Sequence, residues 1–342
     1  MRLRSFFFVL AFAPMLSAQA PAARLRHIVV IFQENVSFDH YFATYPRALN
    51  PSGEPAFHAL PHTPKVAGLR GALLIANPNQ RNPENGEGAA NPFRLDRSQA
   101  ATADQSHAYT AEQKAFHGGR MDLFPKFTGR RGPPPLAAPL TAPLTDRSAT
   151  DAQRSPISGK GLTMGYFDGN TVTAIWNYAQ HYAMSDRFFG STFGPSTPGA
   201  LNLVSGQTNG VSETINGRAG IIDGGAGSFT DISDSDPLHD VCSRSGGTNF
   251  AMSGPSIGNL LNAANLSWGW FQGGFNLALV NPNGTTGCQR SHHSDITGFS
   301  PRDYVPHHEP FQYYASTANP RNLRPASVEA IGKSDDPANH QY

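Results

Sequence analysis

A short apolar segment near the beginning of the chain constrains the fold most strongly. Residues 28–32 read Ile-Val-Val-Ile-Phe, and the polar residues Gln33, Glu34 and Asn35 follow directly. A run that is apolar at every position and mostly β-branched is typical of a strand buried on both faces, as in parallel sheets. Residues 37–42 indicate the start of a helix. We therefore expect a strand, a polar turn and a helix over residues 28–42.

Later segments alternate between helical and extended patterns. We expect helices over residues 103–117, 171–183 and 257–261, and a strand over residues 268–271. Strands that alternate with helices favour an α/β sheet protein. In such sheets, ligands bind outside the carboxyl ends of the strands, where Glu34 and Asn35 would lie.

A tight turn precedes one further expected helix. Residues 194–199 read Gly-Pro-Ser-Thr-Pro-Gly, and apolar residues continue from there to Ser205. Ser196 or Thr197 can cap a helix at this point, and Pro198 suits its first turn. We therefore expect a helix that begins at this turn and runs towards Ser205.

Two proline-containing stretches interrupt these patterns. Residues 46–100 are rich in Pro, Asn and Gly and indicate a long irregular excursion, and residues 131–160 indicate a Pro-rich surface loop. Neither has the character of a clear linker between domains. The length of 342 residues would suit about two domains, but without a clear linker one large domain over residues 21–342 fits equally well, and we expect the latter.

The first 20 residues have the pattern of a secretory signal peptide. Arg2 and Arg4 precede an apolar run over residues 6–16, and Ala18-Gln19-Ala20 supplies the small residues that a signal peptidase requires. The alternative, a membrane anchor, would need about 20 apolar residues to span the bilayer. We therefore expect a secreted or periplasmic protein that is cleaved after Ala20 and has no integral membrane anchor.

The chain contains two cysteines, Cys242 and Cys288. An even pair in an exported protein is typical of a disulfide, whereas a reactive thiol or a metal ligand is the alternative. No C-x-x-C pair supports the metal interpretation. We therefore expect a Cys242–Cys288 bridge.

Composition and missing motifs exclude several classes of protein. The formal net charge of +1 shows no basic stripe of the kind that binds nucleic acid. His308-Glu309 lacks the second histidine of a zinc-protease motif, and residues 194–199 do not match the serine-hydrolase elbow. The sequence also contains no P-loop and no dinucleotide-binding fingerprint.

The remaining candidates are oxygen and imidazole groups at expected turns. Glu34 and Asn35 offer oxygens suited to a hard cation, although such a pair is more often a cap or a surface turn. Ser196 could be an exposed nucleophile or an ordinary helix cap. His107 could be an ordinary histidine. His307 and His308 would point to opposite faces of a strand, so that at most one would enter a site.

Three blocks of sequence resemble the bacterial phosphoesterase family that includes secreted phospholipases C and acid phosphatases. They are residues 27–42 with the pattern E-N-x-S-F-D-H-Y-F, residues 186–206 with Asp-Arg-Phe-Phe and Pro-Ser-Thr-Pro-Gly-Ala, and residues 304–314 around His307-His308. The third block is closer to the acid phosphatase branch. The resemblance extends from about residue 27 to the end of the chain.

The resemblance implies an alkaline-phosphatase-like α/β/α sandwich and a metal-dependent phosphoesterase. It implies that Ser196 is the nucleophile of a phosphoseryl intermediate and that Glu34 and Asn35 bind a divalent metal ion. His107 and one of His307 and His308 would face the phosphate. The substrate would be a small phosphate ester or a phospholipid.

The chain departs from the family at its C-terminus. Family members continue beyond the counterparts of residues 340–342 with a paired-aspartate metal motif and a further site histidine, and Asp335-Asp336 is not that motif. We therefore expect a fold that is incomplete at the C-terminus and a chain that by itself has little activity and poor solubility. The alternatives to an active enzyme are an inactive fragment and a secreted binding protein that retains the fold.

Overall fold

The computed structural model describes residues 25–100, 102–130, 159–190, 192–272, 280, 284, 287–293 and 300–341. The chain divides into a short N-terminal segment that ends at Gln33 and one compact unit from Glu34 to the C-terminus. The expected signal peptide, and the Pro-rich loop apart from residues 159–160, lie outside the described residues. Within the described part, no helix is long and apolar enough to cross a membrane.

The strand expected over residues 28–32 is absent, and this prediction was wrong. These residues have no regular secondary structure, and their side chains are 42–84% exposed. A buried parallel strand needs hydrogen-bonded neighbours on its two edges. None of the described strands pairs with this segment, so the apolar pattern has no sheet in which to be buried.

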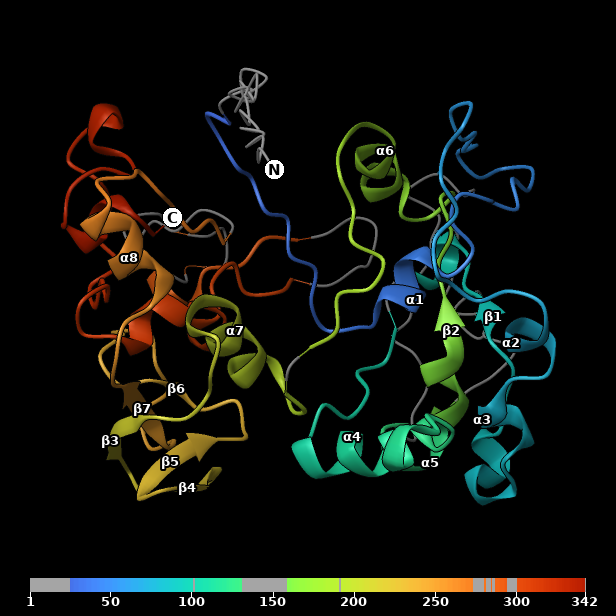
Figure 1. The fold of residues 1–342 in the computed structure, drawn as a ribbon, viewed down its shortest axis with the longest axis horizontal. Helices are drawn as coiled ribbons and strands as arrows, with labels where there is room; N and C mark the ends of the chain where they lie inside the picture. Colours follow the sequence, from blue (N-terminus) through green and yellow to red (C-terminus); the bar gives the residue numbers. More distant parts are fainter. Residues whose placement is uncertain are drawn as a thin grey trace, which may run out of the picture. The chain divides into compact units, whose positions relative to one another are not determined.

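The described unit contains short helices and short strands (Figure 1). The α-helices are α1 (Phe38–Phe42), α2 (Ala72–Ile75), α3 (Pro78–Arg81), α4 (Tyr109–Phe116), α5 (Phe124–Phe127), α6 (Thr173–His181), α7 (Ser196–Ser205) and α8 (Ile257–Ala263). The strands are β1 (Phe93–Arg94), β2 (Gly165–Tyr166), β3 (Val211–Ile215), β4 (Ile221–Gly225), β5 (Ser228–Asp231), β6 (Asp236–Pro237) and β7 (Asn249–Met252). Among the 3₁₀ helices, η7 (Pro306–His308) and η8 (Pro310–Tyr313) concern the site.

The strands form three small sheets. Strands β1 and β2 make a parallel pair, whereas β4 and β5 make an antiparallel hairpin. In the third sheet β7 is central, antiparallel to β3 and parallel to β6. This mixture of helices with parallel and antiparallel pairs is compatible with the α/β class. The α/β/α sandwich itself stays a prediction.

Helix predictions were more accurate than strand predictions. Helices α6, α7 and α8 confirm the helices expected from residues 171, 196 and 257, and α1 confirms the expected helix start after Ser37. The helix expected over residues 103–117 is shorter than predicted, because α4 begins at Tyr109 and His107 precedes it. Residues 268–271 form no strand; Trp270 makes only an isolated bridge to Gln341.

Two apolar clusters form most of the described core. One combines residues of α7, β3, β4, β7 and η8, and its buried members are Leu201, Val204, Val211, Ile221, Phe250, Met252, Phe311, Tyr313 and Tyr314. The other surrounds the fully buried Trp176 of α6, and its other buried members are Phe42, Tyr45, Phe57 and Val66. Since helix propensity alone rarely stabilises short helices, this packing holds α1, α6 and α7 in place.

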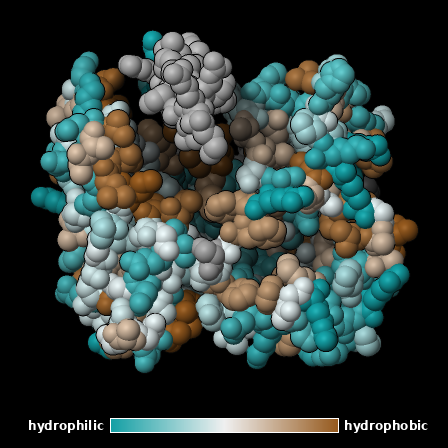
Figure 2. Space-filling model, viewed as in Figure 1, coloured by the Kyte–Doolittle hydropathy of each residue, from teal (hydrophilic) through white to brown (hydrophobic). Residues whose placement is uncertain are grey.

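Apolar side chains also occur at the surface. Figure 2 shows them interspersed with polar side chains on the face that is drawn. Phe188 and Phe189, which belong to the Asp-Arg-Phe-Phe sequence of the second family-like block, are 61% and 80% exposed. Scattered apolar residues of this kind are ordinary on protein surfaces.

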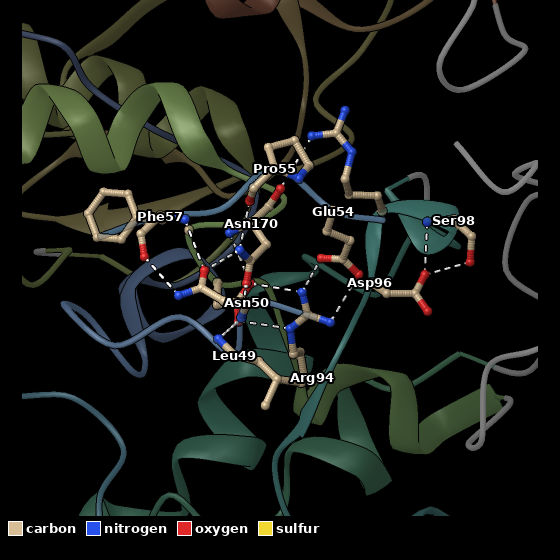
Figure 3. A network of polar contacts seen from close by, with 12 residues as sticks. Leu49, Asn50, Glu54, Pro55, Phe57, Arg94, Asp96, Ser98 and Asn170 are labelled. Carbon is tan, nitrogen blue, oxygen red and sulfur yellow. Dashed lines mark hydrogen bonds and ion pairs between the residues drawn. The ribbon is translucent and has the colours of Figure 1, made fainter. Parts of the chain in front are cut away.

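A partly buried polar network fixes the loop after α1 (Figure 3). The Asn50 backbone N–H donates to Asn170 Oδ1, and Asn170 Nδ2 donates to Asn50 Oδ1, at 2.9 and 2.7 Å. Asn50 also bonds both backbone groups of Phe57, and Arg94 bridges Glu54 and Asp168. Because buried polar groups are costly when left unpaired, these bonds specify one conformation of the loop.

The disulfide prediction is confirmed. Cys242 and Cys288 are bridged, with 5.1 Å between their Cα atoms. The bridge joins the segment after β6 to a 3₁₀ turn at Gly287–Gln289. The loop that it closes contains β7 and α8.

Replacing both cysteines with serine is expected to lower the free energy of unfolding by about 2–4 kcal/mol. The reason is that the two residues are 46 positions apart, so that the bridge removes substantial conformational freedom from the unfolded chain. Urea denaturation of the oxidised wild type and the double variant measures the difference. An unchanged free energy of unfolding would contradict this account.

Candidate active site

Ser196 lies at the first position of α7, at the amino end of a ten-residue helix. Its hydroxyl donates a hydrogen bond to Glu34 Oε2 at 2.8 Å, across 162 residues of sequence. Pro195 is the N-cap residue and Ser196 is already helical, so the interpretation of Ser196 as an ordinary cap is wrong. The structure thus brings together two residues that were predicted from separate motifs.

The turn before α7 depends on a glycine. Gly194 has φ of +114°, a region that side chains rarely adopt, and a Cβ there would lie 3.3 Å from Pro198 Cγ. The Gly194 N–H donates to Glu112 Oε2 of α4 at 2.8 Å. Burial raises the pKa of Glu112, while the Gly194 N–H and His107 act in the opposite direction. Helix α4 therefore holds the turn that presents Ser196.

Glu34 and Asn35 are both exposed and precede α1. Asn35 has φ of +77°, in the left-handed region that asparagine tolerates better than most residues. This conformation supplies a physical reason for an asparagine at position 35 that is independent of any ligand. Glu34 has no regular secondary structure and Asn35 begins a bend, while the strand expected before them is missing.

Asp234 holds the amino end of α7 from outside the helix. Its Oδ1 accepts from the Thr197 backbone N–H at 3.0 Å and from the Thr197 hydroxyl at 3.3 Å. Thr197 is fully buried. Because the first N–H groups of a helix have no partner within it, Asp234 replaces the missing capping side chain.

His307 lies between two carboxylates. Its Nδ1 is 3.1 Å from Asp236 Oδ1, and its Nε2 is 3.9 Å from Asp234 Oδ1. Asp236 Oδ2 also accepts from the backbone N–H of Arg244 at 2.9 Å. Burial alone would raise the pKa of Asp236, but the hydrogen bonds from His307 and Arg244 outweigh it and lower the pKa.

His308 lies beside His307 in the 3₁₀ turn η7, not in a strand. The two rings meet edge to face with centroids 4.6 Å apart. Burial lowers the pKa of His308, whereas the charges of Glu34, Asp234 and Asp236 act to raise it. The premise that the two neighbours point to opposite faces therefore fails, and both rings belong to the same cluster of charged groups.

His107 has a different set of contacts. Its Nε2 is 3.3 Å from Asp104 Oδ1. The residue stands just before α4, whose Glu112 holds the turn at Gly194. His107 is thus linked to the Ser196 turn through α4, and no contact between the two side chains is seen in the described structure.

The described residues do not show the expected metal site. Within the described residues, no group of three or more His, Cys, Asp or Glu side chains is arranged to hold a metal ion. Glu34 and Asn35 have suitable oxygens, but a hard divalent cation takes about six or more oxygen ligands. These two residues therefore fit as part of a ligand set and do not form one alone.

Asp234 and Asp236 are the site residues that sequence reasoning missed. A signal was present, because residues 231–236 carry three carboxylates in six positions of a chain that is only 15% charged. No motif distinguished them from surface acids. Their importance is visible only from the contacts that they make with α7 and η7.

The assembled groups suit chemistry on a phosphate ester. A hydroxyl stands at a helix amino end, and the Glu34 carboxylate accepts its hydrogen bond. His307 lies beside Asp234, which also bonds this helix end, and His308 packs against His307. A helix amino end favours anions. The model of the Phosphoesterase family matches residues 25–340. This match covers nearly the whole sequence, and the protein therefore belongs to the Phosphoesterase family of hydrolases that act on phosphate esters.

Proposed function

We propose that the protein is an exported, metal-dependent phosphoesterase that works through a phosphoseryl intermediate on Ser196. The observation that carries the proposal is the hydrogen bond from Ser196 Oγ to Glu34 Oε2 at the amino end of α7. A serine hydroxyl is a weak nucleophile unless a neighbouring group accepts its proton. Glu34 is placed to do so.

The amino end of α7 would bind the ester phosphate. Its aligned peptide dipoles place partial positive charge near Ser196, which stabilises an anionic group there. Asp234 already bonds the Thr197 N–H at this end, and its negative charge opposes the approach of a phosphate. Additional positive charge at the phosphate is therefore needed.

The histidines and a cation are the candidates for that charge. A divalent ion held in part by Glu34 and Asn35 would neutralise a phosphoryl oxygen. His307 and His308 can donate to non-bridging oxygens or to the leaving oxygen. His107, two residues before the start of α4, is the third histidine that we propose to face the phosphate.

The reaction would proceed in two balanced steps. Ser196 Oγ bonds to phosphorus as the bond from phosphorus to the leaving alcohol oxygen breaks. The hydroxyl proton passes to Glu34, and the leaving oxygen takes a proton from a site histidine. Water then attacks phosphorus, returns a proton to the histidine and displaces Ser196 Oγ, which recovers its own proton. The products are an alcohol and phosphate, or a diglyceride and a phosphorylated alcohol.

Hydrolysis of p-nitrophenyl phosphate, a phosphomonoester, and p-nitrophenyl phosphorylcholine, a model of a phospholipid head group, tests the proposal. The proposal predicts release of p-nitrophenol from at least one ester, lost after treatment with a chelator and restored by a divalent metal ion. The little activity expected from the sequence for this chain by itself predicts the opposite result, so the assay decides between the two. The preferred ester distinguishes an acid phosphatase from a phospholipase C. Binding of either ester without turnover under any metal would contradict the proposal and favour a binding protein.

The same measurement includes variants of the two candidate ligands. Glu34→Ala and Asn35→Gly are expected to lower bound metal, measured by elemental analysis of the purified protein as well as by activity. Glycine is the suitable replacement for Asn35, because alanine would add strain at φ of +77°. Unchanged metal content and activity in both variants would remove Glu34 and Asn35 from the ligand set.

A further inference from the structure

The segment Asp234–Asp236 contacts both halves of the candidate site. Asp234 bonds the amino end of α7, and Asp236, the first residue of β6, bonds His307 of η7. The intervening Ser235 accepts a hydrogen bond at its carbonyl oxygen from the Tyr313 hydroxyl of η8 at 2.6 Å. Three residues thus tie the nucleophile helix to the histidine segment.

We propose that Asp236 is a positioning residue that fixes the ring orientation and the tautomer of His307, so that Nε2 faces the amino end of α7. The role of the His307 ring in hydrolysis rests on the proposed function. The orientation itself follows from the geometry. Nδ1 is bound to Asp236 at 3.1 Å, and Nε2 is directed towards Asp234, the residue that caps α7.

The carboxylate determines which nitrogen carries hydrogen. An ionised carboxylate only accepts hydrogen bonds, so the Nδ1 atom that faces Asp236 must carry the proton. In the neutral ring, Nε2 is then an acceptor, and in the charged ring it becomes a donor. In both forms Nε2 is the nitrogen left for substrate. This is the function that an aspartate performs for the histidine of a catalytic triad.

Asp236 is itself held firmly. Its side chain is 2% exposed, and Arg244 donates to its second oxygen through both the backbone N–H and Nε, at 2.9 and 3.3 Å. Strand β6 pairs with β7, which places Asp236 opposite Asn249. A side chain held from its backbone and from both oxygens is suited to orient a ring, because its own freedom is already removed.

Kinetics of Asp236→Asn give the first test. We expect kcat to fall about 10- to 100-fold with KM changed by less than about threefold, because the amide can donate to Nδ1 and favour the wrong tautomer. In the His307→Gln background, the same change should have no further effect on kcat. Asp223→Asn is the matched control, since this carboxylate lies on an exposed part of β4 and should leave kcat unchanged.

Nitrogen NMR of the protein labelled with ¹⁵N-histidine gives the second test, which needs no activity. His307→Gln identifies the signals of His307. At alkaline pH we expect hydrogen on Nδ1 in the wild type and a shift towards hydrogen on Nε2 in Asp236→Asn. Hydrogen on Nε2 in the wild type would overturn the proposal even if Asp236→Asn failed to fold.

The two measurements separate this inference from the proposed function. A shifted tautomer with unchanged kcat would show that the ring takes no part in hydrolysis and would overturn the positioning role. Equal losses of kcat from Asp236→Asn in the wild-type and His307→Gln backgrounds would also overturn it. If the wild type hydrolysed no phosphate ester, the proposed function would fail, whereas the NMR result would still decide the orientation of His307.

Discussion

Ser196→Ala is expected to lower the rate of phosphate-ester hydrolysis by at least about 10³-fold. The change removes the oxygen that would bond to phosphorus, and nothing else in the described site offers a hydroxyl at the first position of α7. The fold should be retained, because the hydroxyl donates its hydrogen bond to the exposed side chain of Glu34 and not to a buried group. Steady-state kinetics and thermal unfolding of the same preparation measure both effects.

Trapping the intermediate makes this prediction specific. Acid quenching during turnover should leave a phosphoryl group on the wild type, located at Ser196 by peptide mass spectrometry, and none on the variant. Ser205→Ala is the matched control, since it deletes a hydroxyl from the other end of the same helix, where the group bonds the Leu201 and Gln207 carbonyls. A larger loss from Thr197→Ala, or a phosphoryl group on another residue, would contradict the assignment.

The position of Ser196 could be predicted because its causes are local. A glycine, a proline at the N-cap position and a following apolar pattern lie within a few residues, and they determine where α7 begins. The same holds for α6, whose buried Trp176 lies within a clear helical pattern. The disulfide between Cys242 and Cys288 could be predicted from the even number of cysteines and the expected export of the protein.

The apolar segment over residues 28–32 shows where local pattern fails. Its composition is that of a buried strand, but a strand is stabilised by partners that are distant in sequence. The described sheets contain no such partner, and the side chains are exposed. The expectation of poor solubility rests on a sheet that has lost its neighbours, and it stays a prediction.

The polar half of the site could not be predicted for a related reason. Asp234 and Asp236 act through Thr197 and His307, which are 37 and 71 residues away in sequence. The sequence places a carboxylate at each position, but it does not indicate which helix end or which histidine ring that carboxylate will contact. The edge-to-face packing of His307 on His308 likewise depends on a 3₁₀ turn that begins at Pro306.

A set of partly buried polar contacts around Arg94 and Asp168 holds the loop after α1. The guanidinium donates to both oxygens of Asp168, from Nε at 2.8 Å and from a terminal nitrogen at 3.0 Å, and it also pairs with Glu54. Burial lowers the pKa of Arg94, but the hydrogen bonds to Asp168 and Glu54 outweigh it, so the pKa lies above its ordinary value. The network therefore depends on Arg94 remaining paired.

Asp168→Ala is expected to lower the free energy of unfolding by about 3–5 kcal/mol, the usual cost of removing one partner of a buried ion pair. Asp168 is 2% exposed, and its oxygens also accept from the backbone N–H groups of Leu49 and Asn170 at 2.9 and 3.1 Å. In the variant, the Arg94 guanidinium would keep Glu54 as its one carboxylate partner, and the N–H groups of Leu49 and Asn170 would lose their acceptor, which further lowers stability. Urea denaturation followed by tryptophan fluorescence measures the loss of stability, because Trp176 packs in the core beside this loop.

Glu54→Gln is the matched control. It removes a charge from the same network (Figure 3) but leaves the two hydrogen bonds between Arg94 and Asp168, so the free energy of unfolding should fall by about 1 kcal/mol or less. Equal losses from the two variants would show that charge balance, and not the buried pair with Asp168, stabilises the loop.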